Sequence, residues 1–203
     1  MMKNTEWGAV AYLSLSNYGI NKAININNNS DFMTGYSSVS LSETGTDSSV
    51  TLPYNTETGY QATTTGNITG IYDMSGGAEE YMAAFFDGPL DSTGGFQTDP
   101  TITYGAKYFD KYPNTSTATS FNNRILGDAT GEIGPFYKYD IGNGYNITYN
   151  NWMPSRANFV NSGHPWITRG GCYLHAPYNN QLLFLNSLGS SIDFNGFRLV
   201  LAN

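Results

Sequence analysis

The chain has 203 residues, of which 39% are hydrophobic and only 12% charged, and its net charge is −7. Nine scattered Lys and Arg residues form no cluster able to neutralise a phosphate backbone, which argues against nucleic acid as a partner. A single cysteine, Cys172, excludes an internal disulfide framework and a cysteine-based metal site, and no apolar run reaches the roughly 18 residues of a membrane span.

The first part of the chain predicts one helix followed by loops. Asn4 or Thr5 can cap the helix, Glu6 suits its first turn, and Gly19 can end it in a left-handed conformation. Residues 21–59 are polar and rich in turn formers, which predicts loops and short strands. Partial alternation of apolar and polar residues over 66–74 then predicts a short, half-buried strand.

The rest of the sequence predicts secondary structure clearly in some stretches and poorly in others. Residues 78–86 favour a helix on residue type alone. Residues 88–162 show turns and isolated aromatics, and we interpret them as a long insertion with short strands that the sequence does not place. Residues 166–171 and 196–201 predict two buried strands. We find no internal repeat and no linker, so we expect a single domain over 1–203.

Four short motifs carry a resemblance to a known family. Residues 70–81 read Gly-Ile-Tyr-Asp-Met-Ser-Gly-Gly-Ala-Glu-Glu-Tyr, residues 169–171 Arg-Gly-Gly, and residues 196–198 Gly-Phe-Arg, while the Asn-Thr-Glu-Trp of residues 4–7 opens the predicted helix. Together and in this order they resemble the formylglycine-generating-enzyme family, a variant of the C-type lectin fold. The resemblance implies a loop-rich α+β fold with short antiparallel strands and one or two helices. It also implies that residues 78–81 are extended, which we prefer to the helix.

The catalytic residues of that family are missing. Its enzymes use two cysteines that bind copper, and the corresponding positions here are His175 and Asn180. Cys172 lies three residues from the nearer position and has no partner, and His164 and His175 are the only histidines. The resemblance therefore implies no copper and no enzyme activity. Two alternatives stay open: a family oxidoreductase with altered chemistry, and a structural surface or pilus-like module.

The C-terminal region is similar to the variable proteins of diversity-generating retroelements. In these bacterial and phage proteins, about two dozen variable residues lie between Arg-Gly-Gly and Gly-Phe-Arg, as residues 172–195 do here. The similarity implies a non-catalytic domain on a cell surface or phage virion, which binds a protein or cell-surface ligand through this segment. The residues that we expect to contact the ligand are Cys172, Tyr173, Leu174, His175, Tyr178, Leu188, Ile192 and Phe194.

Codon chemistry offers one check of this hypothesis. Changing the adenines of an Asn codon that ends in a pyrimidine never yields Lys, Glu, Gln, Met or Trp, and Gln181 alone belongs to that set in residues 172–195. Gln181 is therefore expected to be a fixed scaffold position. Leu183, Phe184, Phe197 and Leu199 are expected in the core. Arg169 and Arg198 are expected to hold backbone carbonyls or a carboxylate.

The resemblance also implies a structural calcium site. Residue by residue, its ligands fall on Asp73, Gly76, Ala78 and Glu80, and two carboxylates with backbone carbonyls suit a hard cation. The alternative is that Asp73 caps the turn at residues 75–77 and that Glu80 is solvated.

Overall fold

The computed structural model describes residues 1–28, 35–37, 52–87, 108–113, 136–140, 146–150, 155–156, 160–175 and 181–200. These residues contain one α-helix and a mixed sheet of five strands, which confirms an α+β fold. No helix among them is long and apolar enough to cross a membrane. In chain order the elements are α1 (Asn4–Ser14), β1 (Tyr36–Ser37), β2 (Leu52–Pro53), the 3-10 helix η1 (Gly59–Ala62), β3 (Glu79–Asp87), β4 (Asp110–Pro113), β5 (Phe136–Asp140), β6 (Asn146–Asn150), β7 (Ser155–Arg156), β8 (Trp166–Arg169), the 3-10 helix η3 (Tyr173–His175), β9 (Phe184–Ser187) and β10 (Asn195–Gly196).

Helix α1 begins one residue earlier than a capping Asn4 would allow. Lys3 is its N-cap, and the Lys3 backbone N–H donates to Glu6 Oε2 at 2.8 Å. The carboxylate of Asp110, on β4, accepts from the backbone N–H of Thr5 at 2.8 Å and so satisfies a free donor of the first turn. The helix ends at Ser14, five residues before Gly19, because Ser14 turns its hydroxyl back onto the carbonyl of Ala11.

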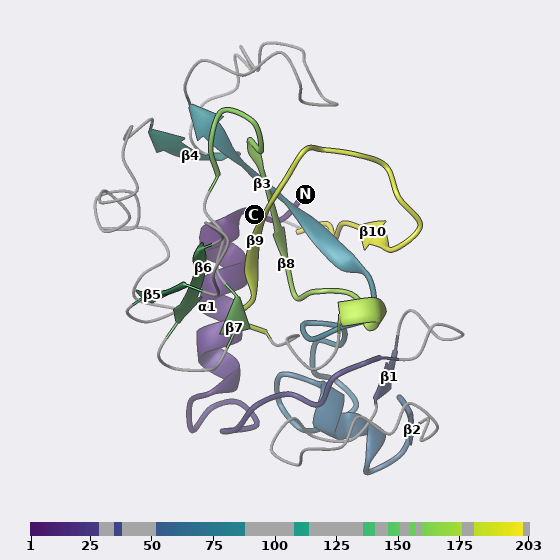
Figure 1. The fold of residues 1–203 in the computed structure, drawn as a ribbon. Helices are drawn as coiled ribbons and strands as arrows, with labels where there is room; N and C mark the ends of the chain where they lie inside the picture. The colour runs from purple at the N-terminus through teal and green to yellow at the C-terminus, as the bar shows by residue number, and fades with distance from the viewer. Residues whose placement is uncertain are drawn as a thin grey trace.

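The main sheet is built around β3. Its order is β10-β3-β8-β9, and β4 also pairs with β3 (Figure 1). The pairs of β3 with β10 and with β4 are parallel, whereas β3 with β8 and β8 with β9 are antiparallel. The short antiparallel strands that were expected are present, together with two parallel pairs that the sequence did not predict. β4 lies within residues 88–162, so part of the expected insertion is a strand of the main sheet.

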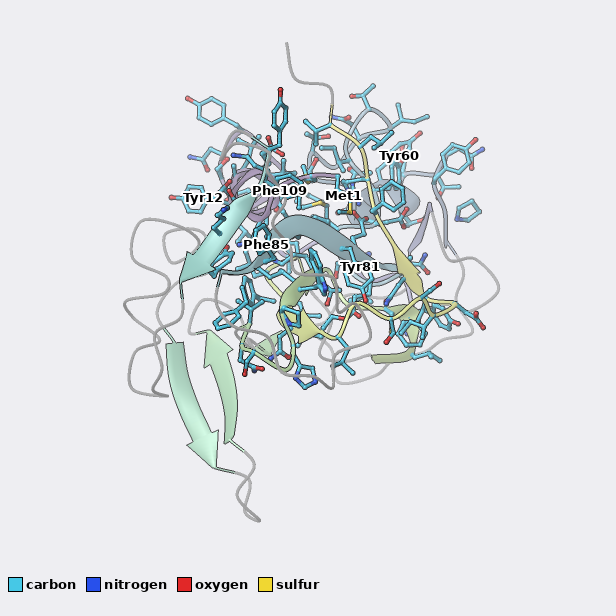
Figure 2. The ribbon with its side chains drawn as sticks, turned by 90° about the horizontal axis from the view of Figure 1, so that it is seen from above. Met1, Tyr12, Tyr60, Tyr81, Phe85 and Phe109 are labelled. Carbon is cyan, nitrogen blue, oxygen red and sulfur yellow. The ribbon has the colours of Figure 1, made fainter. Side chains whose placement is uncertain are left out.

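The two faces of β3 differ because side chains alternate along a strand. Met82, Ala84 and Phe86 join the core cluster with Trp7 and Ala11 of α1, which packs on this face (Figure 1). Phe85 lies on the other face, where its ring is 6.1 Å from those of Trp166 and Phe109 (Figure 2 labels Phe85 and Phe109).

The chain ends meet at this sheet. The Met2 N–H donates to the carbonyl of Arg198 at 3.1 Å, and the Met2 carbonyl accepts from Ala83 at 2.7 Å. Ala83 lies where the register of β3 with β8 shifts, between Tyr81 and Phe85. The bulge thus frees a donor of β3 for the N-terminal segment, which lies between β3 and the C-terminal residues.

Two predicted strands are not observed as such. Residues 66–74 form turns and bends with no strand, because Thr63, Thr64 and Asn67 bind neighbouring backbone N–H groups and close local turns. Among the described residues 196–200 of this stretch, only Gly196 belongs to a strand, and 197–200 are exposed or half-buried. Residues 166–169 do form a buried strand, β8. Residues 79–87 are extended against their helical propensity, and the first three of them lie in the stretch 78–81 for which the resemblance implied this conformation.

Candidate functional site

The four motifs that carry the resemblance converge on the indole of Trp7. Trp7 is fully buried, and the guanidinium carbons of Arg198 and Arg169 lie 5.1 and 5.9 Å from its ring. A Cβ on Gly170 would come within 3.3 Å of the same ring. The backbone N–H of Gly76 donates to the Gly170 carbonyl at 2.9 Å and so joins the first motif to the second. Residues distant in the sequence therefore form one contiguous unit.

Arg169 is a fully buried structural residue. Its Nε donates to the carbonyl of Leu183 and its Nη1 to Asn4 Oδ1, both at 2.7 Å. Its guanidinium also lies 5.5 Å from the ring of Phe184. These contacts join α1, β8 and the start of β9, as expected for an arginine whose fixed donor geometry ties irregular segments together.

Arg198 connects the C-terminal segment to the first motif. Its Nε donates to Glu80 Oε2 at 2.5 Å and its Nη2 to Glu80 Oε1, while Nη2 also donates to the Tyr72 carbonyl at 3.2 Å. Both oxygens of the Glu80 carboxylate are thus engaged by one guanidinium. This bidentate geometry is the strong form of an arginine–carboxylate pair.

Both carboxylates among the four expected calcium ligands, Asp73, Gly76, Ala78 and Glu80, already have partners within the protein. Both oxygens of Glu80 bind Arg198, and both oxygens of Asp73 accept the Gly35 N–H at 2.9 Å. Asp73 has a positive φ of 60°, and burial raises its pKa to about 6 despite that hydrogen bond. No group of three or more His, Cys, Asp or Glu in the described residues could hold a metal ion. The calcium site stays a prediction from the resemblance alone.

The segment 172–195 contributes part of the core. Cys172, Gln181, Leu182, Leu183 and Phe184 are all buried. The burial of Gln181 agrees with a fixed scaffold position: its carbonyl accepts from the Trp7 indole N–H at 3.0 Å. Cys172 was expected on the ligand-facing side, and this was wrong, because it lies between buried Gly171 and the 3-10 helix with no exposed area.

The same segment also has side chains that are exposed or half-buried. Leu174 on η3 is 59% exposed and Ile192 is 41% exposed, while Tyr173, Leu188 and Phe194 are half-buried. Backbone hydrogen bonds bring the two parts together at the start of β3: the Tyr173 N–H donates to the Gly77 carbonyl, and the Glu79 N–H donates to that of Phe194. Figure 1 shows η3 and β10 flanking this end of β3. Tyr178 and the side chain of His175 lie outside the described residues.

Phe197 is a further correction. It was expected in the core but is 62% exposed, and Leu199, also expected in the core, is 77% exposed. Arg198 between them points inward to Glu80, and in an extended segment its two neighbours must then point outward.

The sequence analysis missed a polar network that fixes the loop before β10. The Tyr81 hydroxyl shares a 2.8 Å hydrogen bond with that of Ser187 and donates to the Ser190 carbonyl at 3.0 Å. The amide of Asn195 donates to the Tyr81 hydroxyl and to the Ser190 carbonyl, each at 3.2 Å. Tyr81 is labelled beside the yellow C-terminal segment in Figure 2. The alternation of Glu79 and Tyr81 along the extended residues is the signal that could have predicted a polar face here.

Glu79 is the second residue that the sequence analysis missed. It is only 7% exposed, and burial raises the pKa of its carboxyl to about 7, against a smaller lowering by the nearby Thr168 hydroxyl. Its Oε1 has no hydrogen-bond partner in the described part of the chain. A buried carboxyl group of this kind requires a proton, a donor or a cation.

None of the protein families, curated proteins or solved structures with which the chain was compared matches it. The functional reasoning therefore depends on the residues themselves.

Proposed function

We propose that the chain is a non-catalytic ligand-binding domain of the formylglycine-generating-enzyme type of C-type lectin fold. It displays residues 172–195, diversified by a retroelement, to a protein or cell-surface ligand, and it acts on a cell surface or phage virion. The observation that carries the proposal is that this segment contains both buried scaffold residues and exposed residues. Gln181, which altered Asn codons cannot produce, is a buried scaffold residue, whereas Leu174 and Ile192, which they can produce, are exposed.

The architecture suits a surface whose residues change. Leu174 is attached through the backbone of Tyr173 to Gly77, and the loop that bears Ile192 is held by Tyr81 and Asn195. Most of these anchors are backbone groups or residues of β3. Substitutions at the exposed positions therefore leave the supports of both parts intact, and surface changes of this kind alter stability by only about 0.5 kcal/mol.

Two features support the absence of catalysis. Cys172, the sole thiol, is buried and has no exposed area, and thiolate chemistry requires access to the substrate. Arg169 and Arg198 are both engaged in structural contacts. Purified protein supplied with copper and a cysteine-containing peptide is expected to consume no oxygen, and copper-dependent uptake would support the enzyme alternative.

The deciding test compares copies of this gene from related strains. We expect substitutions concentrated within 172–195 at exposed positions such as 174 and 192, with Gln181, Leu182 and Phe184 unchanged. A reverse transcriptase gene and a near-identical template repeat should lie nearby. Substitutions spread evenly over the chain, or concentrated at the buried positions, would contradict the proposal and favour a structural module.

A further inference from the structure

Three buried side-chain oxygens that make no hydrogen bond of ordinary length lie on the face of the main sheet opposite α1. They are Glu79 Oε1, Thr168 Oγ1 and Asn195 Oδ1, and within the described residues their nearest compensation is the Thr168 hydroxyl, which lies close enough to Glu79 to lower the pKa of its carboxyl. Glu79 is 7% exposed and Thr168 only 1%. Native proteins leave few buried polar groups unsatisfied, so three from three adjacent strands indicate a missing occupant.

The register of the strands brings the three side chains to one place. Asn195 on β10 is the partner of Glu79 on β3, and Thr168 on β8 is the partner of Tyr81. Glu79 and Tyr81 are two positions apart and so face the same side of the sheet. Their partners on the neighbouring strands face that side too, which sets Glu79 between Thr168 and Asn195.

The hydrogen bonds of the amide determine which atom of Asn195 faces this group. Its Nδ2 lies 3.2 Å from the Ser190 carbonyl, which can only accept a hydrogen bond. Exchanging the two amide atoms would set oxygen against oxygen, so Nδ2 is the correct assignment there. Oδ1 is thereby left for the group with Glu79.

Once Glu79 is ionised, the described residues supply too few donors for these oxygens. Thr168 then carries the single hydroxyl hydrogen of the set, and one hydrogen cannot satisfy both Glu79 and Asn195. Arg169 is the register partner of Glu80 and therefore lies on the opposite face, where Arg198 also binds Glu80. Neither arginine compensates the charge of Glu79.

We propose that one monovalent metal cation, Na⁺ or K⁺, binds Glu79 Oε1, Thr168 Oγ1 and Asn195 Oδ1 and so joins β3, β8 and β10. Carboxylate, hydroxyl and amide oxygens are ligands for hard cations, and a single carboxylate among neutral oxygens balances a single positive charge. The ion stabilises the end of the loop that carries Ile192 and Phe194. It differs from the calcium site that the resemblance implied, which uses the opposite face of β3 through Glu80.

The test measures the melting temperature of the whole chain at pH 8 and constant ionic strength. N-methyl-D-glucamine chloride, whose cation is too large to enter, is replaced stepwise by sodium or potassium chloride. At ten times the dissociation constant, binding should raise the melting temperature by roughly 3–6 °C for a chain of this length. Calcium or magnesium chloride at low millimolar concentration forms a separate arm.

Two variants and a control locate the effect. Glu79→Gln and Thr168→Val should abolish or strongly reduce the response to sodium and potassium. Glu57→Gln makes the same chemical change at an exposed turn position and should respond as the unmodified chain does. Equal melting temperatures in all salts would overturn the proposal and favour a buried water molecule at the site. A response to divalent ions alone, or one retained by Glu79→Gln, would also overturn it.

Discussion

The guanidinium of Arg198 and the carboxylate of Glu80 join two segments that are 118 positions apart in the sequence. Both side chains are largely buried, with 21% and 9% of their areas exposed. Arg198 also contacts the Trp7 ring, and its carbonyl accepts from Met2. One residue therefore connects both ends of the chain with the central strand of the sheet.

Replacing Arg198 with Ala should lower the free energy of unfolding by about 2–4 kcal/mol, because Glu80 would keep a buried charge without its partner. Chemical denaturation measures this change. Lys22→Ala, which removes an exposed positive charge, should alter stability by less than about 0.5 kcal/mol. An Arg198→Ala variant as stable as the unmodified chain would show that the ion pair contributes nothing.

Gly76→Ala should be much more destabilising than Gly35→Ala. Both glycines have positive φ, at 75° and 72°, and thus share the strain of an alanine in that conformation. A Cβ on Gly76 would lie 2.1 Å from the carbonyl oxygen of Asn27, whereas on Gly35 the nearest atom is 3.8 Å away. We expect a difference of at least about 2 kcal/mol between the two variants in urea unfolding. Equal losses would mean that the backbone around Gly76 relaxes at little cost.

Stability should fall as the pH rises from about 4.5 to 7. Burial raises the pKa of Glu79 from 4.5 to about 7, so over this window the folded protein holds a proton that the unfolded chain has released. The stabilisation is fully present below pH 4.5 and lost by pH 7, and it amounts to about 3 kcal/mol at most. Asp73, with a pKa raised from 3.8 to about 6, adds a change of the same sign at lower pH.

Glu79→Gln should flatten the part of this profile between pH 6 and 7 and leave the part from Asp73. The measurement belongs in N-methyl-D-glucamine buffer, since a bound cation would favour the ionised carboxylate. A profile unchanged by the substitution would rule out Glu79 as its source.

Leu174→Ser and Ile192→Ser together should change ligand choice with little cost in stability. Both side chains are exposed, so the free energy of unfolding should change by no more than about 1 kcal/mol. Leu182→Ala, a substitution of a fully buried residue of the same segment, should cost about 2–5 kcal/mol. Similar losses for the two variants would identify the exposed pair as core.

Phe197→Ser should alter the melting temperature by only about 2 °C, because the ring is mainly exposed. Phe184→Ala, at a fully buried ring, should cost about 3–5 kcal/mol. A large loss for Phe197→Ser would restore the core position that the sequence analysis gave it.

The sequence predicted those elements whose signals are local. Residues 7–13 of helix α1 form a continuous apolar stretch, strand β8 begins with two large apolar side chains, and both elements were found in the expected regions. The start of the helix was misplaced because the Asn4 side chain binds Arg169, a partner 165 positions away that no local pattern reveals. The resemblance predicted the extended conformation of residues 79–81 alone, and the rest of β3 was not predicted, since the propensity of these residues favours a helix and only pairing with neighbouring strands overrides it.

The candidate site was predicted in outline. The split of residues 172–195 into scaffold and surface was expected, but Cys172 and Phe197 were each assigned to the wrong side. Both lie where side chains no longer alternate between the two faces of a strand. Cys172 follows Gly171, which has a positive φ, and Phe197 follows the end of β10. The parallel pairing of β10 with β3 places Glu79 beside Asn195, and no pattern within either segment indicates that neighbour.

The central place of β3 has a consequence for how the protein is made. Its described partners on one edge come from residues 195–196 and 110–113, and on the other from 166–169, so every pairing waits for later parts of the chain. On the ribosome, α1 and β3 emerge long before the Arg198 guanidinium can reach Glu80. During that interval the apolar face of β3 is covered only by segments that precede it in the chain, among them α1. Sheets whose strands pair with such distant segments fold slowly, and their folding intermediates expose apolar surface and aggregate. Chaperone assistance and low temperature should therefore raise the yield of folded protein.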